Sequence, residues 1–393
     1  MNMKTRMHIF RLILVPIAGS LILGCTTAGV RSTVSEVEFQ ELMSGEVLVG
    51  EPVDTSDIPD PGLFELDDAM RAFVAENVGD TNAERGRMRR LLSAMIESGL
   101  MSLDYDDSTT KTARETFHDR VGNCISFTSL FVALGREANL DVSFQIVDVP
   151  PIWYSDSNLI ILNNHVNALV RQNFGSRVVV DFNVTDLKGD YETREVSDDY
   201  ALALYFNNIA MDALRAGEVR ESFKLLKKSI ETYPRIVDTW TNLGVLYARN
   251  EEYEHAIKAY SIALKLDKTH RPSLTNLAAV YRNMGDNETA DFYARRVNRY
   301  QQQNPYYHYY TALAAYKSDE LDTALERLEP AFRLRRDEHK FYQLQGLIYA
   351  RKGDTETALD NFKRARDLAV YGDAQSILDR KIALLSSTQR FGR

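Results

Sequence analysis

The chain is organised around one stretch, Val121-Gly122-Asn123-Cys124-Ile125-Ser126-Phe127-Thr128. A glycine leads into an apolar run with helical spacing, so Cys124 is expected in the first turn of a helix. Unpaired backbone N–H groups and the positive end of the macrodipole at that place favour a thiolate over a thiol. Cys124 is therefore a candidate nucleophile; the alternative is a small buried cysteine that only packs.

The residues on both sides of this stretch predict a domain with helices first and strands after them. Apolar positions at helical spacing predict helices over 64–78, 82–98, 112–118 and 124–138. The period then changes to two, which predicts strands over 142–146, 165–170 and 177–183. The connection from 150 to 165 is long enough to form a loop over a site.

The separation of His165 and Asp181 is even, so in a hairpin these residues stand on one face of the sheet. A hairpin centred on Asn173, with a five-residue loop from Arg171 to Gly175, would place them directly opposite each other. Taken alone, each residue has a purely structural interpretation. His165 could be a surface or core histidine with its hydrogen bonds made, and Asp181 could be a carboxylate at a turn or at the edge of the sheet. With Cys124 they supply a nucleophile, a base and an orienting group.

The stretch from about Glu84 to Asn183 resembles the transglutaminase-like core. The match rests on Arg120-Val121-Gly122-Asn123-Cys124, on the helix Leu130 to Ala138, on His165 and on Val179-Val180-Asp181. The resemblance implies an α+β, papain-like fold and a catalytic triad of Cys124, His165 and Asp181. It also implies that some relatives keep the fold as a binding module without turnover.

Three positions depart from the family's pattern. Ile125-Ser126 stands where a polar pair such as Arg-Asp commonly follows the cysteine. Asn167 stands where the family has an aromatic residue two places after the histidine, and Asp181-Phe182 replaces Asp-Pro. These three departures weaken the inference of activity from the resemblance, for which an intact triad is necessary but not sufficient.

The second half of the chain repeats with a period of 34 residues. Small residues recur at this spacing in three registers, one of which is Ser222, Ala256, Ala290, Ala324 and Ala358. The pattern resembles the tetratricopeptide repeat, an all-α solenoid. Five units are expected, beginning at Ala203, Val237, Arg271, Pro305 and His339, with a capping helix over 373–385.

Such arrays present a concave face made by the first helix of each pair. Two registers fall on it: asparagines at Asn208, Asn242 and Asn276, and basic residues at Arg215, Arg249, Lys317 and Arg351. One interpretation is a groove for an extended peptide or an acidic tail, with asparagines meeting the backbone and cations meeting carboxylates. The other is an ordinary solvated inner face.

The N-terminus has the pattern of a targeting segment. Lys4, Arg6 and Arg11 precede an apolar run too short to span a bilayer, which ends in Ile22-Leu23-Gly24-Cys25. This string resembles the lipobox of bacterial lipoproteins, which implies cleavage before Cys25, its lipidation and a membrane anchor. Thr26 in place of Asp after the cysteine favours the outer membrane, with the chain facing the periplasm. A plain secretory leader or an anchor helix is the alternative.

These patterns divide the chain into a leader (1–24), a flexible tether (25–62), a transglutaminase-like domain (63–199), five repeats (200–372) and a capping helix with a tail (373–393). If Cys25 carries lipid, Cys124 has no intramolecular partner, because the chain has 2 cysteines.

The charge excludes one class of partner. The net charge is −9, and removal of Lys4, Arg6 and Arg11 with the leader makes it −12. No basic block stands out, so nucleic acid is not expected. The histidines show no ligand spacing, so neither a metal nor another cofactor is expected.

Two functions remain. The first is an envelope thiol enzyme that cleaves or transfers an amide bond, with the repeats recruiting a protein or peptide partner. The second is a catalytically inactive adaptor for envelope protein assembly.

Overall fold

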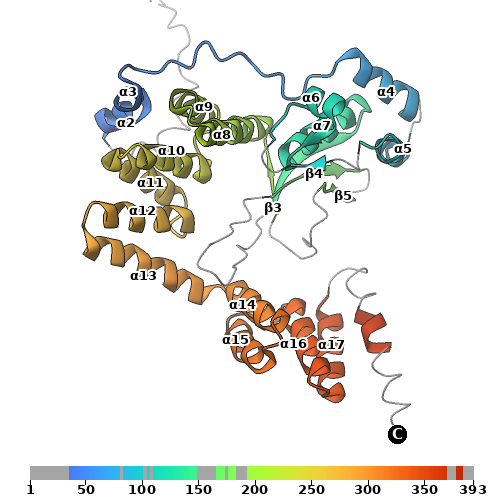
Figure 1. Cartoon of the computed structure of the whole chain (residues 1–393). Helices are drawn as coiled ribbons and strands as arrows, with labels where there is room; N and C mark the ends of the chain where they lie inside the picture. The colour runs from blue at the N-terminus through green and yellow to red at the C-terminus, as the bar shows by residue number, and fades with distance from the viewer. Residues whose placement is uncertain are drawn as a thin grey trace, which may run out of the picture.

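The computed structural model describes residues 35–79, 83–100, 104–106, 109–147, 165–172, 176–182, 193–369 and 378–383. An N-terminal part with helices and strands is followed by a long array of paired helices (Figure 1). Within these described ranges no helix combines the length and the apolar character that crossing a membrane requires.

The N-terminal part combines helices with a four-stranded antiparallel sheet of order β5-β4-β3-β6. Its strands are β3 (Asp141–Val147), β4 (His165–Arg171), β5 (Arg177–Val180) and β6 (Thr193–Val196). Its helices are α4 (Asp68–Val78), α5 (Glu84–Glu97), α6 (Ala113–Asp119) and α7 (Cys124–Glu137). The predicted helices and the first three strands are present, whereas β6 was not predicted because only four residues pair and three of them are exposed.

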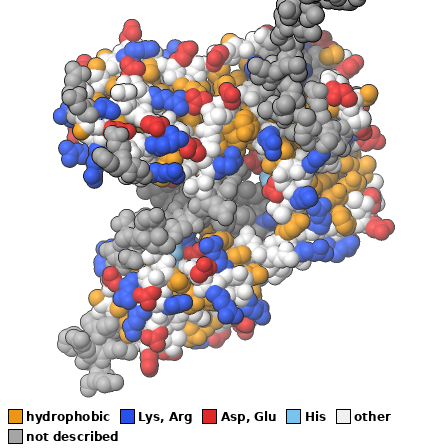
Figure 2. Space-filling model, turned by 180° about the vertical axis from the view of Figure 1, so that it is seen from behind, with side chains coloured by type: hydrophobic (Ala, Val, Ile, Leu, Met, Phe, Trp, Pro, Cys, Tyr) orange, Lys and Arg blue, Asp and Glu red, His pale blue; other side chains and the backbone are white. Residues whose placement is uncertain are grey.

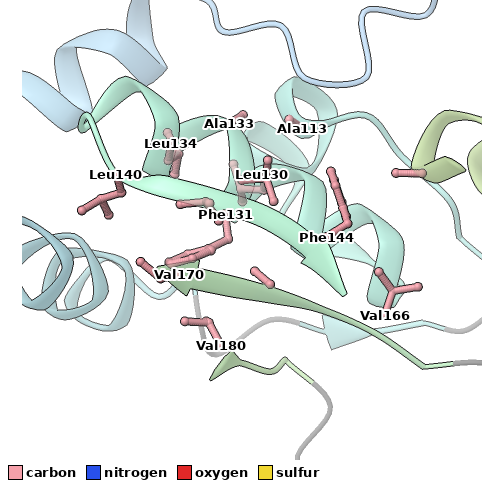
Figure 3. Packing of buried hydrophobic residues seen from close by; sticks show 14 of the residues in the cluster. Ala113, Leu130, Phe131, Ala133, Leu134, Leu140, Phe144, Val166, Val170 and Val180 are labelled. Carbon is pink, nitrogen blue, oxygen red and sulfur yellow. The ribbon is translucent and has the colours of Figure 1, made fainter. Parts of the chain in front are cut away.

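Helix α7 forms the centre of this part. Its residues 125–135 are all buried, and Leu130, Phe131 and Leu134 pack with Phe144 and Val170 of the sheet (Figure 3). A buried hydrogen bond adds to this packing: Thr128 Oγ1 donates to the Val166 carbonyl oxygen at 3.2 Å. Because Thr128 lies one turn after Cys124 and Val166 directly follows His165, this bond holds the start of α7 beside the start of β4.

The β4–β5 hairpin differs in register from the expectation. Arg171 pairs with Arg177, and the Gln172 N–H donates to the Ser176 carbonyl oxygen at 2.9 Å. The hairpin is therefore centred on residue 174, not on Asn173, and its loop is shorter than the predicted five residues. The register therefore differs from the expected one by two residues. Because this shift is even, His165 and Asp181 still lie on one face of the sheet, but they are diagonal neighbours instead of directly opposite each other.

Residues 35–62, expected to be a tether, instead pack on the helical array. They contain α2 (Glu36–Ser44), which begins with a capping box of Ser35 and Glu38, and α3 (Glu46–Val49). Phe39, Leu42 and Met43 of α2 are buried in the core of the array. Their i, i+3, i+4 spacing is a helical signal that the surrounding polar residues obscured. We call residues 35–62 the N-terminal strap; the rest of the expected tether and the leader lie outside the described residues.

The array consists of five helix pairs. They are α8 (Asp198–Ala216) with α9 (Val219–Thr232), α10 (Val237–Arg249) with α11 (Tyr253–Leu266), α12 (Arg271–Asn283) with α13 (Asn287–Gln303), α14 (Pro305–Lys317) with α15 (Leu321–Leu334), and α16 (His339–Arg351) with α17 (Thr355–Leu368). Four pairs begin at the predicted residue, and the first begins five residues before Ala203. A short helix at 378–383 packs Leu378 against the last pair, within the span predicted for the cap.

The packed interior of the array is divided. One core, shared with the N-terminal strap, reaches from α8 to Tyr293 of α13, and a separate core begins in α14. Helix α8 belongs to two cores: Tyr200 packs in the N-terminal part and Phe206 packs in the array. The described side chains on the face in Figure 2 intersperse acidic and basic residues rather than gathering one sign of charge.

Candidate functional site

The turn into α7 is shaped by a glycine and an asparagine. A Cβ on Gly122 would lie 2.6 Å from the Cβ of Ser126, so only glycine fits at that position. Asn123 is the N-cap: its Oδ1 accepts from the Ser126 N–H at 3.2 Å and from the Ser126 hydroxyl at 3.0 Å. Its Nδ2 donates to Thr110 Oγ1 at 2.7 Å. Cys124 is consequently the first residue of α7, where backbone N–H groups lack intrahelical acceptors.

The three side chains singled out in the sequence meet at this turn. His165 Nε2 lies 2.6 Å from Asp181 Oδ1, and His165 is only 5% exposed. The half-buried Cys124 thiol is a hydrogen-bond partner of the same imidazole. Asp181 and Cys124 thus both act on the imidazole of His165.

The protonation of His165 follows from these contacts. Burial works to lower the pKa of His165, but hydrogen bonds to Asp181 and Cys124 and the charges of those groups outweigh it and raise the pKa from 6.5 to about 9. At neutral pH the imidazole therefore carries its proton between a carboxylate and a sulfur. This arrangement can hold a thiolate beside an imidazolium and return the proton to a leaving group.

The residue after Asp181 is anchored by aromatic contacts. This residue, Phe182, packs its ring 6.1 Å from the ring of Phe127 and 6.0 Å from that of Phe131, centroid to centroid. Both partners lie in α7, so the helix that presents the thiol also fixes the end of β5. The sequence did not predict this contact. There Phe182 is notable only as the residue that replaces the proline of the family's Asp-Pro.

The asparagine register of the array is partly a hydrogen-bonded chain. Asn242 Nδ2 donates to Asn207 Oδ1 at 2.9 Å, and Asn207 Nδ2 donates to Asn208 Oδ1 at 3.3 Å. Asn276 bonds to the Tyr260 hydroxyl. All three predicted asparagines are half-buried, and the buried Asn207 that joins two of them was not predicted. The adjacent Asn207-Asn208 pair is the signal that could have identified it.

The four basic residues are exposed and lie at or next to the C-terminal ends of first helices. Arg215 pairs with Asp212, and Arg351 pairs with Asp319 at 2.9 Å while its guanidinium lies over the Tyr316 ring. For Arg249 and Lys317, no ion pair occurs within the described part of the chain. A cation at a helix C-terminus is favoured by the macrodipole, so the register has a structural cause whether or not it binds a ligand.

A second histidine, His270, also lies between an aspartate and a hydroxyl group, as in a hydrolytic triad. His270 Nε2 lies 3.1 Å from Asp238 Oδ1, and its Nδ1 lies 2.9 Å from Ser273 Oγ. Ser273 is fully buried and shares a further bond with Thr241. A nucleophile without access to solvent cannot reach a substrate, so this cluster joins the second and third helix pairs and has no catalytic geometry.

Other predicted features fall outside the described residues. These are Cys25 and the loop expected over the site between 150 and 165. In the ranges that the structure describes, no three histidine, cysteine, aspartate or glutamate side chains gather in a way that could hold a metal ion.

Comparison with known proteins identifies the second half of the chain. A sequence profile of the tetratricopeptide repeat matches residues 203–386. Residues of MamA from Desulfovibrio magneticus RS-1, from position 41 to its end, are 23% identical over 44% of this chain and 96% of that chain, with a TM-score of 0.25. YrrB, described as a TPR protein with an unusual peptide-binding site, is 17% identical over 45% of this chain and 92% of its own, with a TM-score of 0.24. No curated protein matches the chain.

The C-terminal part of the chain is thus a tetratricopeptide repeat array, a protein-interaction architecture, preceded by an N-terminal part that contains strands.

Proposed function

We propose that the chain is a lipid-anchored envelope thiol enzyme of the transglutaminase-like class, which breaks an amide bond through Cys124, His165 and Asp181. The observation that supports it is the contact set of one buried imidazole, which bonds Asp181 at 2.6 Å and meets a thiol at the mouth of a helix. A cysteine that only packs, or a histidine that is only hydrogen-bonded in the core, would not need a thiol, an imidazole and a carboxylate side by side.

The reaction would proceed in two steps. The Cys124 sulfur attacks the carbonyl carbon, the C–N bond breaks, and the His165 proton passes to the leaving amine, so a thioester remains on the enzyme. Water, or an amine in the case of transfer, then attacks the thioester, gives a proton to His165 and releases the product. The Cys124 backbone N–H at the start of α7 would donate to the developing oxyanion. Hydrolysis and transfer need the same residues, and abundant water favours hydrolysis.

The test is the pH dependence of Cys124 alkylation by iodoacetamide. Cys25→Ser makes Cys124 the sole cysteine, and in that background we expect fast labelling well below the usual thiol pKa of about 8.5. His165→Gln should return the profile to that of an ordinary thiol. His118→Gln is a matched control, because His118 also bonds an aspartate, Asp67, at 2.6 Å but has no bond to Cys124. If Cys124 of the parent protein is alkylated with the pH profile of an ordinary thiol, the proposal of a thiol enzyme is refuted.

That negative outcome would favour the second candidate, a catalytically inactive adaptor. The repeat array, matched over residues 203–386, is the observation in its favour, because such arrays bind proteins whatever the attached domain does.

In either case the asparagine and basic registers of the array are the proposed peptide-binding face. Arg249→Ala with Lys317→Ala should weaken binding of an acidic peptide, and Arg333→Ala, on a second helix, serves as the control.

The anchor is proposed on Cys25. Incorporation of a labelled fatty acid should depend on Cys25 and disappear in Cys25→Ser. Cys25 and Ser35 are ten positions apart, so the intervening chain spans at most about 36 Å. Since the N-terminal strap packs on α9 to α11, the anchor would hold the first repeats close to the membrane surface.

A further inference from the structure

A buried asparagine adjoins the histidine–aspartate pair. Asn167 lies in β4 two residues after His165 and shares its face of the sheet. Ala168 pairs with Val180, so the register continued by one residue places Asn167 opposite Asp181. Asn167 is 3% exposed, and its Nδ2 donates to Asp181 Oδ2 at 3.5 Å. The other carboxylate oxygen, Oδ1, is the one bonded to His165.

The amide of Asn167 has one favourable orientation. Its Oδ1 is buried and has no hydrogen-bond partner within the described residues. Rotation of the amide would free Nδ2 and turn Oδ1 toward the carboxylate, where two acceptors would repel each other. A buried acceptor without a partner destabilises the fold, and asparagine is a poor strand former. Sheet stability alone therefore gives no reason for an asparagine here.

Its cross-strand neighbour is a second buried amide. Gln145 of β3 pairs with Asn167 and is also buried, with Oε1 unpartnered among the described residues. No hydrogen bond joins Gln145 to His165 or Asp181 in the part of the chain that is described. Glu195 of β6, next in the same row, is bonded by Arg171 and Ser143. The donor to Asp181 in this row is Asn167.

We propose that Asn167 is a positioning residue that holds the Asp181 carboxylate in the orientation in which its Oδ1 receives His165 Nε2. The carboxylate is 31% exposed, so loss of this donor weakens the hold on its orientation. The imidazole then loses the bond that orients it beside the Cys124 thiol. This role rests on the proposed function, in which Cys124 is the nucleophile.

The experiment compares donor-deleting variants with a matched amide deletion. Asn167→Leu and Asn167→Ala remove the donor, Asn167→Gln keeps one, and Gln145→Leu removes a buried amide that does not touch Asp181. The full-length Cys25→Ser protein is alkylated across pH, and the titration of His165 is followed by NMR with labelled histidine. Circular dichroism checks that each variant is folded.

Asn167→Leu and Asn167→Ala should slow alkylation at low pH about tenfold, which corresponds to about one pKa unit, and should move the His165 titration toward its ordinary value. Asn167→Gln should recover part of the rate, and Gln145→Leu should match the parent. Two variants guard against one failing to fold.

The two proposals fail in different ways. If the parent protein labels rapidly at low pH and both donor-deleting variants keep its profile and its His165 titration, the positioning role is wrong and the thiol enzyme stands. If the parent labels as an ordinary thiol, the enzyme is wrong. The His165 titration still decides the positioning role in that case, because it does not depend on a reactive sulfur.

Discussion

The proton on His165 makes the stability of the fold depend on pH in a defined direction. The pKa of His165 is about 9 in the folded chain and about 6.5 when unfolded. The folded state therefore binds the proton more tightly, so this stabilisation is complete below about pH 6.5 and is lost as pH rises through about 9. The upper limit of the effect is about 3 kcal/mol at 1.36 kcal/mol per unit.

Asp181→Asn tests this linkage, because it removes the charge that holds the proton and leaves only a neutral amide oxygen as acceptor. Denaturant unfolding of the parent between about pH 6 and pH 10 should show stability falling through this window. The variant should be less stable at the lower pH and show a flatter dependence. Equal slopes in the two proteins would contradict the assignment of the proton to this pair.

Some of this site can be read from single residues and some cannot. The sequence identifies Cys124, His165 and Asp181 as candidates because a nucleophile, a base and a carboxylate are rarely found together. The even separation of His165 and Asp181 also places these two residues on one face of the sheet. The role of Asn167 depends on which residue stands opposite Asp181, and that depends on the hairpin loop. A shift of two residues left the parity unchanged but replaced His165 by Asn167 in the opposing position.

At the scale of elements, the approach of paired helices is set by matched side chains 16 residues apart. A Cβ on Gly244 would lie 2.5 Å from the Tyr260 ring, and one on Gly346 would lie 2.8 Å from the Phe362 ring. In the first and fourth repeats the corresponding pairs are alanine with leucine, Ala210 with Leu226 and Ala312 with Leu328. Glycine thus occurs where the second helix carries an aromatic ring.

This pairing predicts a compensating double substitution. Gly244→Ala should destabilise the array by about 1–3 kcal/mol through overpacking against Tyr260. Gly244→Ala combined with Tyr260→Leu recreates the pair found in two other repeats, so the double variant should be more stable than the sum of the single changes. Thermal unfolding of the four proteins of the cycle measures the coupling; strict additivity would show that the two positions do not interact.

The N-terminal strap predicts a local effect. The Tyr247 hydroxyl donates to the Leu42 carbonyl oxygen at 2.6 Å, and that carbonyl is among the last four of α2, which lack intrahelical donors. Tyr247→Phe should weaken the attachment by about 0.5–1.5 kcal/mol and speed proteolysis within the strap about two- to tenfold. Tyr281→Phe changes the same repeat position without a strap contact and should leave cleavage unchanged.

Periodicity explains why elements differed in how well they could be predicted. Five copies of one 34-residue pattern reinforce each other, so four helix pairs start at the predicted residues. Helix α2 is a single nine-residue helix whose apolar face has three members, and its partner surface lies about 200 residues away in the sequence. A local pattern cannot reveal such a distant partner.

At the scale of the molecule, the distribution of cores defines two cooperative units. Helix α8 packs in both the N-terminal part and the array, and the strap packs on the same repeats, so residues from Ser35 to α13 share buried contacts. Helix α13 buries only Ala290 among its described side chains, and Phe292 is half exposed. The core of α14 to α17 begins beyond this weakly packed helix.

Thermal unfolding should therefore proceed in two transitions, one for each unit, because repeat arrays lose cooperativity where neighbouring repeats share little buried surface. Phe341→Leu perturbs the core of the last two pairs and should lower one transition by about 4–8 °C for each kcal/mol lost, while the other stays in place. Phe206→Leu, in the array core that α8 shares with the strap, should lower only the other transition. Calorimetry of the full chain distinguishes these outcomes: a single transition that both substitutions shift would mean that α13 transmits stability between the units despite burying one side chain.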